Sequence, residues 1–306
     1  MVPVANVVVG CVYCIIAISL LSVNAVVLFI LCRHKEFQTN TYRIIKNMIL
    51  GCMMQLCSHF TGGLMTISNC NLNYYLERIA GAWIQSGWFL YLGASLALAI
   101  DRTQTFVFVW SERTTAMVSY GFLAFSWVIA LVYMVGLMIP GYGFTYHSSS
   151  GYFDWFYDKQ PGTQAYLTLE MCLDFSILVT VLSLYFVVFV RVIMMRRSGN
   201  ARLFSSVVEF RILIIAVISF LYESTYLLWF FWGSNLLPDG VISAVIVTLL
   251  WIFDCGLFSV ATIIINGAIR RKILYSLCRK RYHRAFVTRV AYTKRLPTPS
   301  TVESKA

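Results

Sequence analysis

The chain has 306 residues, of which 59% are hydrophobic and 16% aromatic, while charged side chains make up only 12% and the formal net charge is +11. Soluble domains carry about 25% charged residues, so this composition excludes an ordinary soluble domain and indicates a helical membrane protein. No catalytic triad, phosphate-binding loop or cysteine–histidine metal spacing occurs. We therefore expect no enzyme activity, no cofactor and no metal site.

Seven apolar runs follow one another along the chain, each long enough to cross a bilayer as a helix. The predicted spans are residues 7–32, 44–68, 80–109, 115–140, 164–194, 207–232 and 240–268. They predict an all-α membrane protein in which residues 1–268 form a seven-transmembrane helix bundle. Residues 269–286 place apolar side chains at helical spacing among basic ones, which predicts a short amphipathic cytoplasmic helix. The polar tail, residues 287–306, is expected to be disordered.

The basic residues indicate the orientation in the membrane. Of the 24 Lys and Arg residues, all but Arg78 and Lys159 fall on the side that holds the C-terminus. Basic residues accumulate on the cytoplasmic face of membrane proteins. We therefore expect a multi-pass plasma-membrane protein with its N-terminus extracellular and its C-terminus cytoplasmic. The positive charge is attributed to this topology and to attraction by anionic lipid, and nucleic acid is not expected as a partner.

An ionic pair, Asp101–Arg102, follows the long uncharged stretch of the third predicted span. One interpretation is an interfacial pair, because charges at helix ends cost little and arginine can extend to the headgroups. The other is a switch, in which Arg102 is held by Asp101 in one state and contacts a partner in another. Position alone leaves both interpretations open.

The chain resembles a G-protein-coupled receptor, because it has seven predicted spans and an Asp-Arg pair at the end of the third. It has "DRT" in place of the family's Asp-Arg-Tyr. Asn24 in "SVNAVVLFIL" resembles the polar Asn of the family's first span. "TNTYRIIKNMILGCMMQL" resembles the first loop and second span, and "INGAIRRKIL" resembles the end of the seventh. The resemblance implies a small-molecule ligand, a heterotrimeric G protein as partner, and a switch at Asp101 and Arg102.

Within these receptors the chain is similar to nematode serpentine chemoreceptors of the Srt and Srx families. The stretches that carry this similarity are "TYRIIKNMILG", "HFTGG", "LALAIDR" and "GYFDWFYD". The similarity implies sensory perception of an odorant or pheromone, with sensory-neuron cilia as a location. The chain departs from receptors of the rhodopsin type at three places. Cys52 or a neighbour replaces the sodium-binding Asp, "FSVAT" at 258–262 replaces Asn-Pro-x-x-Tyr, and the Cys at the outer end of span three is missing.

Apart from Asp101 and Glu209, four acidic residues lie inside the predicted spans: Glu170, Asp174, Glu223 and Asp254. An ionisable group at bilayer depth costs roughly 2.5–3.5 kcal/mol, so it normally faces the bundle interior. These residues are candidates to bind a cationic or hydrogen-bond-donating ligand, or they tie helices together as protonated acids. They also motivate an alternative function, an ion- or proton-coupled membrane transporter or channel.

Further candidate ligand-binding residues are Gln85, Trp88, Tyr91 and Tyr226. Trp88 precedes Arg102 by fourteen residues, or about 21 Å at 1.5 Å per helical residue, which predicts a position in the outer half of the bundle. Aromatic side chains in membrane helices also serve packing and interface belts, so a packing role for these residues stays open.

Three residues are candidates for functions on the cytoplasmic side. Arg196 and Arg197 could contact a G protein, although the excess of basic residues on this side would place them there in any case. Cys278 is a candidate lipidation site, and a free thiol is the alternative.

Overall fold

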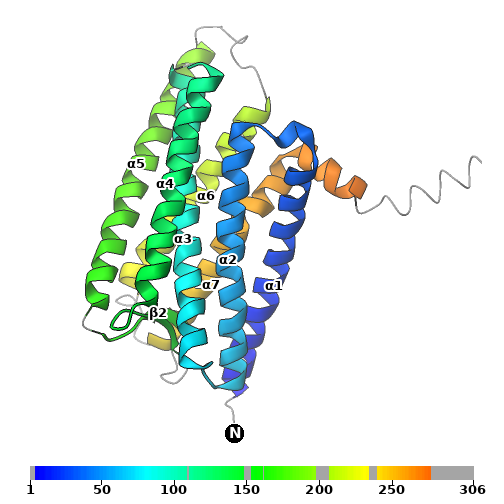
Figure 1. The fold of residues 1–306 in the computed structure, drawn as a ribbon. Helices are drawn as coiled ribbons and strands as arrows, with labels where there is room; N and C mark the ends of the chain where they lie inside the picture. The colour runs from blue at the N-terminus through cyan, green and yellow to red at the C-terminus, as the bar shows by residue number, and fades with distance from the viewer. Residues whose placement is uncertain are drawn as a thin grey trace, which may run out of the picture.

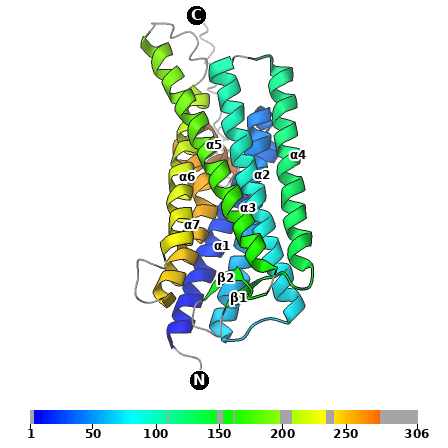
Figure 2. The same ribbon diagram turned by 90° about the vertical axis from the view of Figure 1, so that its left-hand side faces the viewer.

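The computed structural model describes residues 4–108, 110–147, 153–160, 162–197, 207–233 and 240–276. Within these ranges, seven helices run along the long axis of one bundle (Figures 1 and 2). They are α1 (Val4–Arg33), α2 (Asn40–Ser68), α3 (Tyr74–Thr103), α4 (Glu112–Met138), α5 (Thr163–Arg197), α6 (Val207–Trp232) and α7 (Gly240–Ile265). Each is long and apolar enough to cross a membrane.

Short elements complete the described part of the chain. A 3-10 turn, η1 (Lys35–Phe37), joins α1 to α2, and a π-helical turn, η2 (Gln104–Phe108), continues α3. Two strands, β1 (Phe144–His147) and β2 (Asp154–Tyr157), pair in antiparallel fashion between α4 and α5. We call the end of the bundle that carries this hairpin the hairpin end, and the opposite end the Arg102 end.

Helix α3 forms the centre of the bundle. In its most apolar stretch 78% of the residues are buried, against 22% in α5, and α3 contacts α2, α4 and α5. Small residues allow this packing, as is common between membrane helices. A Cβ on Gly51 of α2 would lie 2.7 Å from the carbonyl oxygen of Gly87, and one on Gly87 would lie 2.8 Å from that of Gly51. The two helix backbones therefore touch at this point.

A buried polar contact joins α1 to α7. Asn24, which is 1% exposed, donates from Nδ2 to the carbonyl oxygen of Cys255 at 2.9 Å. Its Oδ1 accepts a hydrogen bond from the hydroxyl of Ser259. Polar side chains inside a membrane bundle are stabilised when they bond across helices in this way.

The helix that follows α7 begins earlier than the sequence indicates. The seventh span was expected to continue to residue 268, but α7 ends at Ile265 and residues 267–276 form a separate helical segment. The reason is Asn266, whose Oδ1 accepts hydrogen bonds from the backbone N–H groups of Ala268 and Ile269, at 3.1 and 3.4 Å. Such a side chain is a helix N-cap.

In the segment 267–276, Ile269 and Ile273 are buried, while Arg270, Arg271 and also Leu274 are exposed. Residues 277–286 of the predicted amphipathic helix lie outside the described residues. The segment projects sideways from the bundle at the Arg102 end (Figure 1). Cys278 and the tail, residues 287–306, lie outside the described residues, as do the side chains of Arg196 and Arg197.

Candidate functional site

The hairpin covers one end of the bundle beside α3, α5 and α7 (Figure 2). Its register places Phe144 opposite Tyr157, Tyr146 opposite Trp155, and His147 opposite Asp154. Phe144, Tyr146 and Trp155 are each at most 2% exposed. Because these aromatic side chains point into the bundle, the hairpin is a packed part of the fold.

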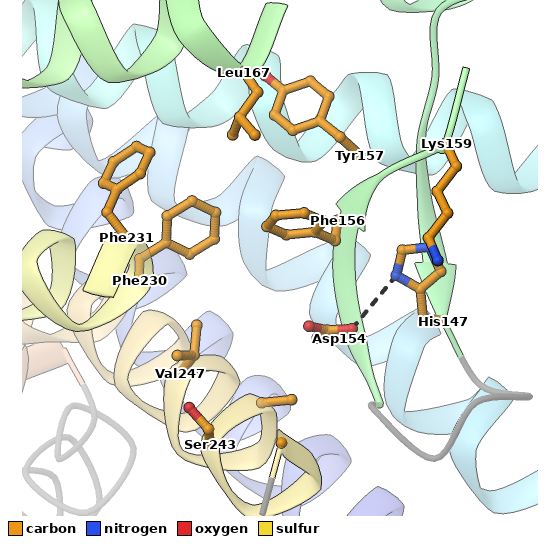
Figure 3. A pocket seen from close by; sticks show the side chains of 12 residues that line it. His147, Asp154, Phe156, Tyr157, Lys159, Leu167, Phe230, Phe231, Ser243 and Val247 are labelled. Carbon is orange, nitrogen blue, oxygen red and sulfur yellow. Dashed lines mark ion pairs between the residues drawn. The ribbon is translucent and has the colours of Figure 1, made fainter. Parts of the chain in front are cut away.

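A cavity of about 690 Å³ opens beneath the hairpin (Figure 3). It is bounded by the hairpin, the start of α5, the end of α6 and the start of α7. Its lining residues are His147, Asp154, Phe156, Tyr157, Lys159, Leu167, Phe230, Phe231, Gly240, Ser243, Ala244 and Val247. Aromatic and aliphatic side chains with a few polar groups are the usual lining of a small-molecule site.

Tyr157 connects the cavity to the polar interior of the bundle. Its hydroxyl donates a hydrogen bond to the carboxyl group of Glu170. Nε2 of Gln85 on α3 donates to the same group and lies 3.2 Å from its Oε1 and 3.1 Å from its Oε2. One helical turn further along α5, Oδ1 of Asp174 accepts from the indole N–H of Trp88 at 3.2 Å. The carboxyl groups of α5 thus hold α5 to α3.

An aromatic cluster packs against Trp88. The ring of Trp88 meets those of Tyr226 and Trp251 with centroids 5.5 and 6.2 Å apart, in edge-to-face geometry. Trp251 also donates to Oε1 of Gln55 at 2.7 Å. Phe230, which lines the cavity, lies 5.9 Å from Tyr226 and 6.3 Å from Trp251. The cluster therefore joins the cavity to α2, α3, α6 and α7.

Glu223 and Asp254 form a second acidic pair. Both side chains, Glu223 on α6 and Asp254 on α7, are 2% exposed. One oxygen each of Asp174, Glu223 and Asp254, and the Tyr91 hydroxyl, are buried without a hydrogen-bond partner among the described residues. In those residues no Lys or Arg forms an ion pair with any of the four membrane acids.

The eight candidate ligand-binding residues gather in this region but do not line the cavity. All are at most 3% exposed: Gln85, Trp88, Tyr91, Glu170, Asp174, Glu223, Tyr226 and Asp254. The cavity is formed by residues on the hairpin and at the ends of α5, α6 and α7, none of which was a candidate. Only the aromatic stretch "GYFDWFYD" could have indicated the cavity residues from the sequence, and it was interpreted there as a similarity to nematode chemoreceptors.

His147 and Asp154 form the charged rim of the cavity. Nδ1 of His147 lies 3.6 Å from Oδ1 of Asp154, as the dashed line in Figure 3 marks. This carboxylate raises the pKa of His147 above its ordinary value, burial opposes the shift, and the charges of Asp158 and Glu77 support it.

The hairpin should therefore be less stable at alkaline pH. Because the pKa of His147 is raised in the folded state, the stabilisation is fully present below about pH 6.5 and is lost as the pH rises through the folded pKa. Hydrogen exchange at residues 144–147 and 154–157, corrected for its intrinsic pH dependence, should become faster as the pH rises above about 6.5 and through the folded pKa of His147. Asp154→Asn should weaken this dependence, because it removes the largest contribution and leaves the smaller ones of Asp158 and Glu77. An equal dependence in that variant would contradict the assignment.

At the Arg102 end, Asp101 is the centre of a buried network. Its carboxylate accepts from Asn40 at 2.9 Å, from Thr41 at 2.8 Å, from Ser119 at 3.4 Å and from Arg102 at 2.5 Å. Arg102 also donates to the hydroxyl of Thr41 at 2.5 Å. Both members of the pair are 1% exposed, so Asp101 and Arg102 lie inside the bundle, between α2, α3 and α4, and not at its surface.

Among the described residues, no three His, Cys, Asp or Glu side chains gather closely enough to hold a metal ion.

Together, the seven helices, the hairpin and the segment 267–276 define an all-α membrane protein with the rhodopsin-like fold. Among solved structures the chain is similar to squid rhodopsin, with a TM-score of 0.68 over 88% of this chain and 84% of the rhodopsin chain. The sequence identity is 13%, so this likeness concerns the fold. No protein-family model and no curated protein sequence matches the chain.

Proposed function

We propose that the protein is a chemosensory G-protein-coupled receptor that binds a small molecule at the hairpin end and activates a heterotrimeric G protein at the Arg102 end. The proposal depends on one observation above all. A cavity of about 690 Å³ at one end is connected through Tyr157, Glu170 and Gln85 to α3, the helix that carries Asp101 and Arg102 near its other end.

This connection provides a way for a ligand to change the Arg102 end. The cavity takes its lining from α5, α6, α7 and the hairpin, so a ligand that prefers one arrangement of these elements shifts the population toward it. Trp88 on α3 contacts α5 through Asp174, α6 through Tyr226 and α7 through Trp251. A movement of those helices is therefore transmitted to α3, as in other helix-shift transitions.

The orientation and the finer family belong to the same proposal. The distribution of Lys and Arg supports an extracellular hairpin end, which carries Arg78 and Lys159, and a cytoplasmic Arg102 end. The sequence similarity to nematode serpentine chemoreceptors supports an odorant or pheromone as ligand. The eight buried candidates then control the response from beneath the cavity, with Arg196 and Arg197 near the G protein and Cys278 as a lipidation site.

A screen in cells with promiscuous G proteins and a panel of odorants tests this function. An active odorant should evoke a G-protein signal through the wild type, and Arg102→Ala should lower it about tenfold or more, within the range of allosteric coupling. The matched control is Arg113→Ala, which removes an exposed arginine at the same end of the bundle and should respond like the wild type.

The four membrane acids, which form no ion pair with Lys or Arg among the residues that the structure describes, favour the alternative, an ion- or proton-coupled transporter or channel. Ligand-evoked current in cells that lack G proteins, with equal size in Arg102→Ala, would support that alternative and contradict the receptor proposal.

A further inference from the structure

Two buried charged residues at the start of α3, Glu77 and Arg78, hold the hairpin on the bundle. Each is 6% exposed. The segment 141–162, which contains the hairpin, has no cysteine, so no disulfide can fix it. Buried charges are costly unless hydrogen bonds satisfy them. Some of the hydrogen bonds of these two residues go to the hairpin and to the chain that leads into it.

Glu77 holds strand β1. Its Oε1 accepts a hydrogen bond from the backbone N–H of Tyr146 at 2.8 Å. Asn71 Nδ2 donates to both carboxylate oxygens of Glu77, at 3.1 and 3.2 Å, and to the carbonyl oxygen of Tyr146 at 3.0 Å. Both backbone groups of Tyr146 are thereby bound. Hydrogen bonds to an ionised group are about twice as strong as neutral ones.

Arg78 holds the end of α4 and the chain that follows it. Its Nη2 donates to the carbonyl oxygens of Leu137 at 2.9 Å, of Ile139 at 2.6 Å, and of Tyr142. The last carbonyl groups of a helix lack partners within the helix and favour a cation. Arg78 therefore caps the C-terminal end of α4 and binds Tyr142 in the segment that leads into β1. Tyr142 lies four residues before Tyr146, which Glu77 binds.

These two attachments set the position of the cavity wall. His147, directly after Tyr146, lines the cavity, as do Asp154, Phe156 and Tyr157 of the paired strand. We propose that Glu77 and Arg78 are positioning residues for this cavity, forming a noncovalent anchor that takes the part of a disulfide between α3 and the hairpin. Only the identification of the cavity as a ligand site rests on the proposed function.

Hydrogen exchange of the full-length protein in lipid nanodiscs tests the anchor. Glu77→Ala and Arg78→Met should each raise the exchange rate of residues 144–147 about tenfold, because loss of charge-assisted hydrogen bonds favours local opening. Peptides from α6 and α7 should change by less than about twofold, since local opening leaves the rest of the fold intact. Arg78→Lys should be intermediate, because an ammonium group lacks the planar guanidinium fork.

A second measurement reports on the cavity itself. Ser243 lines the cavity and is 2% exposed, so a Ser243→Cys reporter in the wild-type background should react slowly with a water-soluble maleimide. Glu77→Ala and Arg78→Met should speed this labelling about fivefold or more as the hairpin opens, as measured by peptide mass spectrometry. The matched control, Leu76→Ala, changes an exposed neighbour in the same helical turn and should alter neither readout.

Unchanged exchange of the hairpin in both variants would overturn the anchor. An increase of equal size in α6 and α7 would also overturn it, because the residues would then support the whole bundle and not the hairpin in particular. Neither readout involves a ligand or a G protein, so a failure of the receptor proposal is distinguishable from a failure of the anchor.

Discussion

Replacing Asp101 with alanine should destabilise the protein by about 3–5 kcal/mol, the usual cost of removing one partner of a buried ion pair. Asp101 accepts hydrogen bonds from Asn40, Thr41 and Arg102 inside the bundle, and the variant removes all of these at once. Thermal unfolding of the purified protein in detergent measures the loss. Under the proposed function, Arg102 would also leave its position more readily, and basal nucleotide exchange on the G protein should rise about fivefold or more.

Ser119→Ala is the matched control for Asp101→Ala. Ser119 donates to the same carboxylate from α4, at the longer distance of 3.4 Å, so its loss should cost no more than about 1 kcal/mol. If Asp101→Ala were as stable as Ser119→Ala, the buried network would contribute little to stability, and the account of Asp101 as its centre would be contradicted.

Gly81→Val should prevent most of the protein from folding. Gly81 lies on α3 one turn after Glu77, and a Cβ at this position would overlap the carbonyl oxygen of Phe144 on β1. Because the obstacle is backbone, the strain cannot be relieved by a side-chain rotation. We expect a loss of about 3 kcal/mol or more, at the upper end for overpacked sites. The yield of monodisperse protein in size-exclusion chromatography measures this effect.

Gly121→Val on α4 is the corresponding control. A Cβ on Gly121 has nothing within 4 Å, so this variant should stay within about 0.5 kcal/mol of the wild type, as for surface substitutions. Equal yields from Gly81→Val and Gly121→Val would show that the backbone of β1 at Phe144 does not pack directly against Gly81 of α3.

The seven-helix architecture could be predicted from the sequence because membrane spans depend on local composition. The contacts of Trp88 with Asp174 and of Gln85 with Glu170 join residues that were each singled out as buried or ligand-facing. The start of α3 shows the limit of this reasoning. The third span was expected from residue 80, yet α3 begins at Tyr74 and includes the charged residues Glu77 and Arg78. Tertiary hydrogen bonds, which composition does not reveal, make burial of both charges possible.

The cavity could not be predicted for a similar reason. Its walls come from the hairpin and three helix ends that are distant in the sequence. The hairpin strands have only four residues each, too few for a periodic pattern to distinguish them from a loop. Their pairing is set by contacts with α3, such as that between Tyr146 and Glu77. The sequence instead predicted ligand-binding residues in the bundle interior, because an acidic residue in an apolar span can be recognised from the sequence alone.

The central claim is that the cavity faces outward and the Arg102 end of the bundle faces the cytoplasm. Epitope tags at the two ends of the chain, in living cells, test this claim most directly. An epitope at the N-terminus, which precedes the start of α1 at the hairpin end (Figure 1), should bind antibody on intact cells. An epitope at the C-terminus should bind only after the membrane is permeabilised. Both epitopes on one side, or the reverse arrangement, would contradict the account.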